Sequence, residues 1–448
     1  MNTFVFLSLF LALGIIYLII GFIASKRIKD NNDYFLAGRK LGFWPLSLTL
    51  IATQLGGGVI LGTCEESYSS GLYGIFYTLG ICLGFWVLAC GFAGKLRGFN
   101  VCTISELLEK KYRSTFLRKI ASILSVMSLG GILIGLVVAS RKFMLGIGID
   151  NEWILAIFWL SLIAYTVIGG LKAVVMTDTL QVGVILAVFT CVLAYVFFSN
   201  PEYLLSTKAM RASTPSGGAS SYLSLLLMPM LFSLVEQDLA QRFFSAKSKK
   251  TAIMASACAG LLLLLFSIVP ITIGILAKNA DIVIPDGSSV LMVTISFLTN
   301  DIVTAFVSCA VLAAIISTAD SLLCAMSSLI AQDFNFPFLK NMTKLTFSKL
   351  VTFILGIVII GMGAFFDDIL KIYIQSYSLP VCALFAPMIF CFFTDRLSKT
   401  AAFMAVFSGL SAFVVLSLYP IGFSTEILAV AVSFIGYALG MSYDKIKE

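Results

Sequence analysis

The sequence has no histidine, and only 12% of its 448 residues carry a charged side chain. A soluble globular protein has about 25% charged residues. The absence of histidine excludes a Ser-His-Asp triad and any histidine-ligated metal site. The ten cysteines contain no CxxC pair and mostly stand inside apolar runs, which is typical of small buried side chains and not of a disulfide framework. Because the sequence also offers no nucleophile–base pair or metal-ligand cluster, we expect a protein that is not an enzyme.

Apolar residues, in contrast, are abundant and occur in long runs. They make up 59% of the chain, and the mean hydropathy is +1.02. A helix needs about 20 apolar residues to cross a bilayer. We therefore expect an all-α polytopic membrane protein, embedded in the lipid bilayer of the plasma (inner) membrane. About thirteen transmembrane helices are predicted, at residues 4–25, 45–64, 72–94, 116–140, 152–168, 173–198, 222–240, 252–277, 302–330, 350–366, 372–393, 401–419 and 425–441.

Lysine and arginine are distributed unevenly between the loops that join these spans. Most of the 30 basic residues fall on alternate loops. The opposite loops hold Arg141, Lys142, Lys208, Arg211, Lys278 and Lys371. Basic loops stay in the cytoplasm, so the N-terminus is expected outside and the C-terminus inside. The net charge of +7 then reflects orientation signals, and we expect no nucleic-acid partner.

A polar stripe interrupts the apolar run 302–330. Ala314, Ser317, Thr318 and Ser321 recur at helical spacing and share one helix face, with Asp320 at its edge. A carboxylate at the centre of a membrane helix costs about 2.5–3.5 kcal/mol, so it is retained for a reason. One interpretation is a hydrogen-bonding seam between helices. The other is a set of hard oxygen donors for a small cation.

Two of the predicted spans contain helix-breaking residues. Gly56, Gly57 and Gly58 stand in the middle of span 2, where each costs about 1 kcal/mol relative to alanine. Pro229 stands in span 7 and frees a backbone carbonyl. The glycines permit either close helix packing or an unwound stretch that lines a cavity. Paired interruptions five spans apart are typical of transporters built from five-plus-five inverted repeats, which bind their cargo at the breaks.

Four motifs resemble the sodium:solute symporter family, which holds the sodium/proline and sodium/glucose transporters. They are DYFLAGRKLG at Asp33–Gly42, GGLKAVVMTDTLQ at Gly169–Gln181, QDLAQRFFSAKS at Gln237–Ser248 and AAIISTADSLL at Ala313–Leu323. The resemblance runs from about Asp33 to Asp395 and is closest to sodium/proline-type symporters. It implies a leucine-transporter-like core of 5+5 inverted repeats. We also expect the stretch Gln237–Arg242 to make cytosolic helix contacts.

The resemblance also implies a division of the chain. Residues 1–44 form an extra N-terminal helix and a cytosolic loop, and residues 45–198 form the first five-helix repeat. An external loop at 199–221 leads to the inverted second repeat at 222–395. Two additional C-terminal helices occupy 396–448.

By the same resemblance, the family's common sodium site maps onto five positions. These are the carbonyls of Ala52, Leu55 and Ala314 and the hydroxyls of Ser317 and Thr318. Such a site is neutral, and it would bind Na⁺ as the coupling ion.

A second sodium site, found in some members of the family, would involve Asp178, Asp320 and Ser321. Those members have a serine where this chain has Asp320, which could strengthen the site, accept a proton or pair with a basic group. Asp178 could instead be a solvated or structural carboxylate near the membrane surface, because it lies about 9 Å along the helix from Lys172.

The solute site is expected beside the two breaks. Its candidate residues are Gln54, Gly56, Gly57, Gly58, Ser233 and Gln375, with Phe76, Tyr77 and Tyr377 as candidate gates. Gln54 departs from the sodium/proline branch, which has an aspartate there. We expect sodium-coupled import of a small organic solute by alternating access, with an amino acid or carboxylate favoured. A proton-coupled symporter that uses Asp178 or Asp320, and a sugar-type sodium symporter, are the alternatives. The sequence does not indicate an oligomeric state.

Overall fold

A computed structural model gives the arrangement of the helices. It describes residues 3–26, 28–149, 151–199, 218–334, 342–366, 369–394, 397–419 and 423–447. Within these ranges the regular secondary structure is helical, apart from an isolated bridge between Leu41 and Ala246, and turns and loops join the helices. Most of the predicted external loop 199–221 lies outside the described residues.

The first half of the chain begins with one long apolar helix and then becomes more interrupted. Its elements are α1 (Thr3–Ser25), α2 (Asn31–Leu36), η1 (Ala37–Arg39), α3 (Phe43–Gln54), η2 (Gly58–Gly62), α4 (Thr63–Ser70), η3 (Gly71–Gly74), α5 (Ile75–Val87), η4 (Leu88–Phe92), α6 (Ala93–Gly98), α7 (Ile104–Tyr112), α8 (Thr115–Gly146) and α9 (Glu152–Ser199).

The second half contains fewer and longer helices. Its elements are α11 (Gly218–Phe232), α12 (Gln237–Ser245), α13 (Lys249–Asn279), α14 (Val290–Leu298), α15 (Asp301–Asp333), α16 (Lys344–Gly363), α17 (Ile369–Phe393), α18 (Lys399–Leu418) and α19 (Thr425–Lys447).

In the described part of the chain, 11 helical stretches are long and apolar enough to cross a membrane. Some of these stretches run through a sharp turn. Gly170 interrupts α9 with φ 51° and ψ −157°, so the predicted spans 152–168 and 173–198 both lie within α9. Gly71, at φ 64°, stands between α4 and α5 inside another stretch. The number of thirteen spans stays a prediction.

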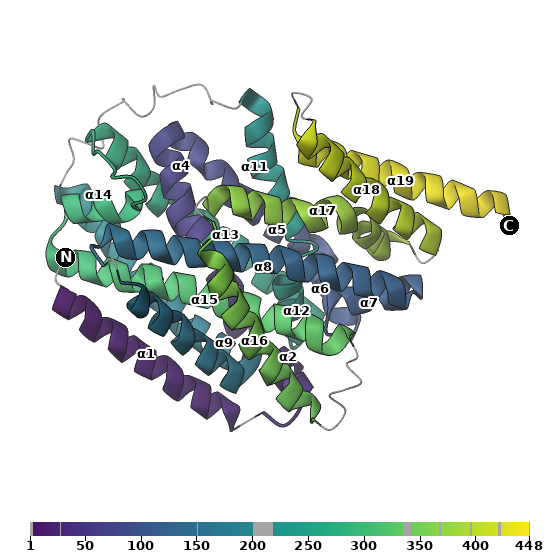
Figure 1. Cartoon of the computed structure of the whole chain (residues 1–448), viewed down its shortest axis with the longest axis horizontal. Coiled ribbons are helices and arrows are strands. Elements are labelled where there is room, and N and C mark those ends of the chain that lie inside the picture. Colours follow the sequence, from purple (N-terminus) through teal and green to yellow (C-terminus); the bar gives the residue numbers. More distant parts are fainter. Residues whose placement is uncertain are drawn as a thin grey trace.

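The helices form a bundle in which α15 lies at the centre. The most apolar 18-residue window of α15 is 83% buried in the protein, against 17% for α1, so α1 presents most of its surface outward. Figure 1 shows α1 along one side of the bundle, where it packs on α9, and α18 with α19 on the opposite side beside α17. This arrangement places α3, α8, α9, α12 and α16 around α15.

Two of the helices are broken near the middle of the bundle. In the first of them, α3 ends at Gln54, where the sequence predicts a break, and its C-cap Leu55 has ψ 35°. The π-helical segment η2 then begins at Gly58. The second break separates α11 from α12 at residues 233–236, slightly beyond Pro229. The helix continues past Pro229 because proline lacks its own N–H but its carbonyl still accepts, here from the Ser233 N–H at 3.1 Å.

Candidate ion and solute site

A group of neutral oxygen atoms lies where the break after α3 faces the middle of α15. The Ser317 hydroxyl donates to the carbonyl oxygens of Ala52 and Ala314, at 3.0 Å each. The Thr318 hydroxyl donates to the same two carbonyls, at 3.5 and 3.3 Å. All these residues are buried. We call Ala52 O, Ala314 O, Ser317 Oγ and Thr318 Oγ1 the neutral oxygen cluster.

The glycines after α3 allow this cluster to form. The last carbonyls of a helix have no donor within the helix. The Ala52 carbonyl is therefore free to accept from the hydroxyls of α15. Leu55, the remaining carbonyl ligand predicted from the sequence, is the C-cap of α3 and belongs to the same open turn. A Cβ atom at Gly56 would stand 2.5 Å from Thr318 Oγ1, so only glycine lets the two segments approach this closely. The geometry provides hard oxygen donors with no formal charge, which suits an alkali cation.

A narrow cavity of about 20 Å³ adjoins the cluster and has room for about one water molecule. Its lining includes five residues that the sequence analysis proposes for ion or solute binding: Gln54, Gly56, Gly57, Gly58 and Thr318. It also includes Tyr77, Tyr373, Tyr377 and Glu236. A solute of several heavy atoms therefore requires these helices to move apart.

Two of the proposed solute residues lie elsewhere. Ser233 is buried, but its hydroxyl donates to the Pro229 carbonyl at 2.9 Å, and it packs beside Gly84 of α5. Gln375 is exposed. Residues 373 and 377 are one helical turn apart and share the face that lines the cavity, which directs Gln375 to another face.

Glu236, which was not predicted as a site residue, has its carboxylate at the second break. Both of its oxygens accept from the Gln54 amide nitrogen, at 3.3 Å each. Its neighbour Asp238 accepts from the Thr53 hydroxyl at 2.8 Å. The signal was available, because a carboxylate directly after an apolar run with a proline is costly in a membrane and marks a functional position.

A second polar group lies one helical turn along α15 and carries charge. The guanidinium of Arg242 donates to Thr49 Oγ1 at 3.0 Å, to Asp178 Oδ2 at 3.5 Å and to the Ser321 hydroxyl. The Thr49 hydroxyl also donates to Asp178. Asp178 is fully buried, so it is not a solvated carboxylate at the membrane surface.

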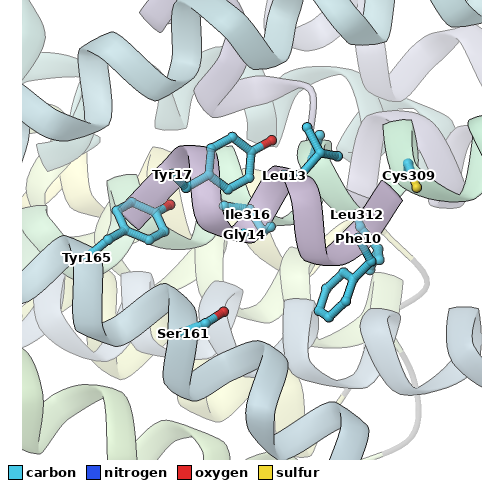
Figure 2. Close-up of a pocket in the computed structure, with 10 residues that line it drawn as sticks. Phe10, Leu13, Gly14, Tyr17, Ser161, Tyr165, Cys309, Leu312 and Ile316 are labelled. Carbon is cyan, nitrogen blue, oxygen red and sulfur yellow. The ribbon is translucent and has the colours of Figure 1, made fainter. Parts of the chain in front are cut away.

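Asp320 lies beside these groups. Its carboxylate accepts from the Tyr165 hydroxyl and from the Ser321 hydroxyl, the latter at 3.3 Å. Figure 2 shows Tyr165 near Tyr17 of α1, at one side of a narrow cavity between α1, α9 and α15; the two rings are 6.1 Å apart. We call Asp178, Asp320 and Arg242, with Thr49, Tyr165 and Ser321, the charged cluster.

The charged cluster contains the three residues predicted for a second sodium site. The sequence analysis assigns that site to Asp178, Asp320 and Ser321. In this structure the Arg242 guanidinium contacts both Asp178 and Ser321, so a cation of the protein itself lies between them. The stretch Gln237–Arg242 does contact the start of α7, where the Ile104 N–H donates to Gln237 at 2.8 Å, but Arg242 turns into the bundle.

Comparison with known proteins agrees with this architecture. The model of the sodium:solute symporter family matches residues 34–409. The chain is 31% identical to the sodium/pantothenate symporter of Escherichia coli (strain K12) over 215 residues, which cover 46% of this chain and 44% of that protein. It is 26% identical to the osmoregulated proline transporter OpuE of Bacillus subtilis (strain 168) over 349 residues, 73% of this chain and 71% of the relative. The chain thus spans less than half of the first relative and about seven tenths of the second.

The fold is similar to that of a Na⁺-coupled sialic acid symporter solved in a substrate-bound outward-open state. The TM-score is 0.82 at 18% identity, and the match covers 97% of each chain. This similarity confirms the expected fold class, an all-α membrane protein with a leucine-transporter-like core.

Proposed function

Because this chain belongs to the sodium:solute symporter family, we propose that it imports a small organic solute together with Na⁺ by alternating access. The observation that carries the proposal is the neutral oxygen cluster, in which two carbonyls and two hydroxyls from a broken helix and α15 converge. The solute would bind in the adjoining cavity, and an amino acid or a carboxylate is favoured.

The position of the cluster suggests how the ion could couple to the solute. A bound Na⁺ would hold the open end of α3 against α15, and the same break lines the cavity. Release of the ion would let the two segments separate and open the solute site. A neutral oxygen set binds the ion weakly enough for release. One charge crossing 100 mV supplies about 2.3 kcal/mol, and a tenfold sodium gradient adds about 1.4 kcal/mol. One ion could thus support a solute gradient of a few hundredfold.

The two helix breaks also support the proposed repeats. The first break lies in the first helix of 45–198, and the second lies in the first helix of 222–395. We place the N-terminus outside and the C-terminus in the cytoplasm, from the distribution of basic residues.

A second candidate is proton coupling through the charged cluster. Asp178 and Asp320 are fully buried, and Arg242 is the cation that contacts Asp178. Two carboxylates beside one guanidinium leave one negative charge, which a proton could neutralise. The Asp320 variant described in the Discussion separates this mechanism from sodium coupling.

The test is the double substitution Ser317→Ala with Thr318→Ala, measured in the full-length protein. We expect it to abolish sodium stimulation of uptake into proteoliposomes and the sodium-dependent rise in the midpoint of thermal unfolding. The matched control is Thr294→Ala with Ser327→Ala, because both hydroxyls are buried and donate within their own helices. Wild-type sodium affinity in the first double variant would refute the placement of the ion.

A further inference from the structure

We propose that the solute carries a positively charged nitrogen, an ammonium or quaternary ammonium group, which binds between Glu236 and the tyrosines that face it. The inference rests on the proposed function, because it takes the cavity at the helix breaks as the solute site. It narrows the solute to organic cations and zwitterions, and it disfavours sugars and simple carboxylates.

The first support is the environment of Glu236. Its side chain lines the cavity and is almost fully buried, at 6% exposure. Its two oxygens face the Gln54 amide, a neutral donor, at 3.3 Å. In the ranges that the structure describes, no lysine or arginine lies within ion-pair distance of this carboxylate. Gln54 thus provides a hydrogen bond but leaves the charge unpaired, and a buried charge is stable only when it is paired.

The second support is the balance of charge around the cavity. Four fully or almost fully buried carboxylates lie on or beside the helices that meet here: Asp178, Glu236, Asp238 and Asp320. Arg242 is the basic side chain among the buried residues of the described chain, and it contacts Asp178. With all four carboxylates ionised, Arg242 and one sodium ion in the neutral oxygen cluster still leave a formal excess of negative charge. A solute with a positive group lowers this excess, whereas an anionic solute increases it.

The third support is a set of aromatic rings that line the same cavity as the carboxylate. The rings of Tyr373 and Tyr377 are 6.3 Å apart, and those of Tyr77 and Tyr377 are 6.4 Å apart. The hydroxyls of Tyr77 and Tyr377 form a hydrogen bond to each other at 2.7 Å, so each already has a partner. Phe232 stacks on Tyr377 at 4.6 Å and covers one face of that ring. The tyrosine rings that line the cavity still offer π surface, which attracts cations. A sugar would instead need several hydrogen-bonding groups at this wall.

The glycines of the first break allow the tyrosines to approach. A Cβ atom at Gly58 would stand 2.5 Å from the Tyr77 hydroxyl and 2.9 Å from Cε2 of Tyr373. The same backbone segment therefore positions the ion ligands and the aromatic wall. A nitrogen centre beside Glu236 would replace the Gln54 amide, whose long side chain can swing aside as the cavity opens.

The test compares solutes that differ only in the charged nitrogen. The purified full-length protein is mixed, with and without sodium, with four pairs: L-proline and cyclopentanecarboxylate, choline and 3,3-dimethylbutanol, glycine betaine and 3,3-dimethylbutanoate, γ-aminobutyrate and pentanoate. D-glucose and succinate are added as neutral and anionic probes. Thermal unfolding and sodium-driven uptake into proteoliposomes are measured. We expect at least one nitrogen compound to raise the unfolding midpoint in sodium while its carbon counterpart does not. If no pair differs, or if glucose, succinate or a carbon counterpart gives the response, the inference is wrong.

The variant Glu236→Gln tests the site itself. It keeps the shape of the side chain and removes its charge, so the affinity for the nitrogen compound should fall at least about tenfold. Stabilisation by sodium alone should remain, because the neutral oxygen cluster is intact. The control is Asp286→Asn, which removes an exposed carboxylate and should bind like the parent. If Glu236→Gln fails to fold, Tyr373→Leu can be used instead, because it removes an aromatic ring. It should lower the affinity for the nitrogen compound by a similar factor.

These outcomes separate the two proposals. A lost or shifted sodium response in Glu236→Gln, measured without solute, would make Glu236 an ion ligand and overturn this inference. A parent protein without any sodium response would overturn the proposed function. Unchanged affinity for the nitrogen compound in Glu236→Gln would overturn the inference while leaving sodium coupling intact.

Discussion

Two polar clusters lie one helical turn apart on α15 and differ in their chemistry. The neutral oxygen cluster consists of carbonyls and hydroxyls, whereas the charged cluster contains two carboxylates and a guanidinium. The Ser321 hydroxyl connects them, since it donates to the Ser317 carbonyl at 2.6 Å. Both clusters are buried to a similar degree, so their chemistry and not their exposure distinguishes them.

The difference indicates which contacts should break during transport. The neutral oxygen cluster joins α3 to α15 through weak hydrogen bonds that an ion can replace. The charged cluster joins α3, α9, α12 and α15 through a buried ion pair, and separating such a pair leaves an uncompensated charge. We therefore interpret the neutral oxygen cluster as the changeable contact and the charged cluster as a permanent joint.

The largest effect should come from removing the cation of the charged cluster. Arg242→Met leaves Asp178 buried without its partner, which costs about 3–5 kcal/mol. We expect a large fall in the yield of folded protein and in the midpoint of thermal unfolding. Adding Asp178→Asn to this variant removes the orphaned charge and should restore part of the loss.

The control for this substitution is Lys110→Met. Lys110 pairs with Glu106 at 2.8 Å on the surface, with 53% of the lysine side chain exposed, and such pairs contribute about 0–1 kcal/mol. If Arg242→Met unfolds at the same temperature as the parent, the charged cluster is not a structural joint.

A smaller effect is expected from disturbing the neutral oxygen cluster by a single methyl group. Gly56→Ala forces the Thr318 hydroxyl away from the Ala52 carbonyl, and overpacking of this kind costs about 1–3 kcal/mol. If this cost falls on the ion-bound state, the sodium affinity drops by about 5- to 150-fold. The sodium affinity is measured as the sodium concentration that gives half-maximal thermal stabilisation.

Gly183→Ala is the matched control, because nothing lies within 4 Å of a Cβ atom at that position of α9. It should leave the sodium response unchanged. Parent-like sodium affinity in Gly56→Ala would show that Thr318 is not an ion ligand.

The smallest effect should follow from Asp320→Asn. The Tyr165 hydroxyl can still donate to the amide oxygen, so we expect the stability to change by about 1 kcal/mol. Sodium-driven uptake should persist with the pH profile of the parent. If Asp320 instead carried a coupling proton, uptake by the parent would rise as the external pH falls, and the variant would lose that rise. Asp286→Asn serves as the exposed control.

Several features of the site were predictable from local sequence. The break at Gly56–Gly58 follows from three consecutive glycines, and the shared face of Ser317 and Thr318 follows from helical spacing. Other features were not predictable in this way. Arg242 belongs to a motif expected to make cytosolic helix contacts, but its side chain reaches Asp178 in the bundle because α12 is buried along its whole length.

The position of the second break decided which side chains line the cavity and which do not. Pro229 indicated an interrupted span, but the helix continued for one more turn and ended at Phe232. This shift placed Glu236 at the cavity and left Ser233 bonded to its own helix. A proline marks where a helix is weakened, whereas tertiary packing decides where it ends.

The sequence by itself determined that the chain crosses a membrane, where one helix breaks, and that hydroxyls line one face of α15. These properties depend on composition and on neighbours within a few turns, so they can be read without knowing the fold. Only the tertiary structure decided that Ala52 meets Ser317, that Arg242 lies between Asp178 and Ser321, and that Gln375 faces outward. These contacts join residues far apart in the chain, and they depend on the rotation of each helix about its axis.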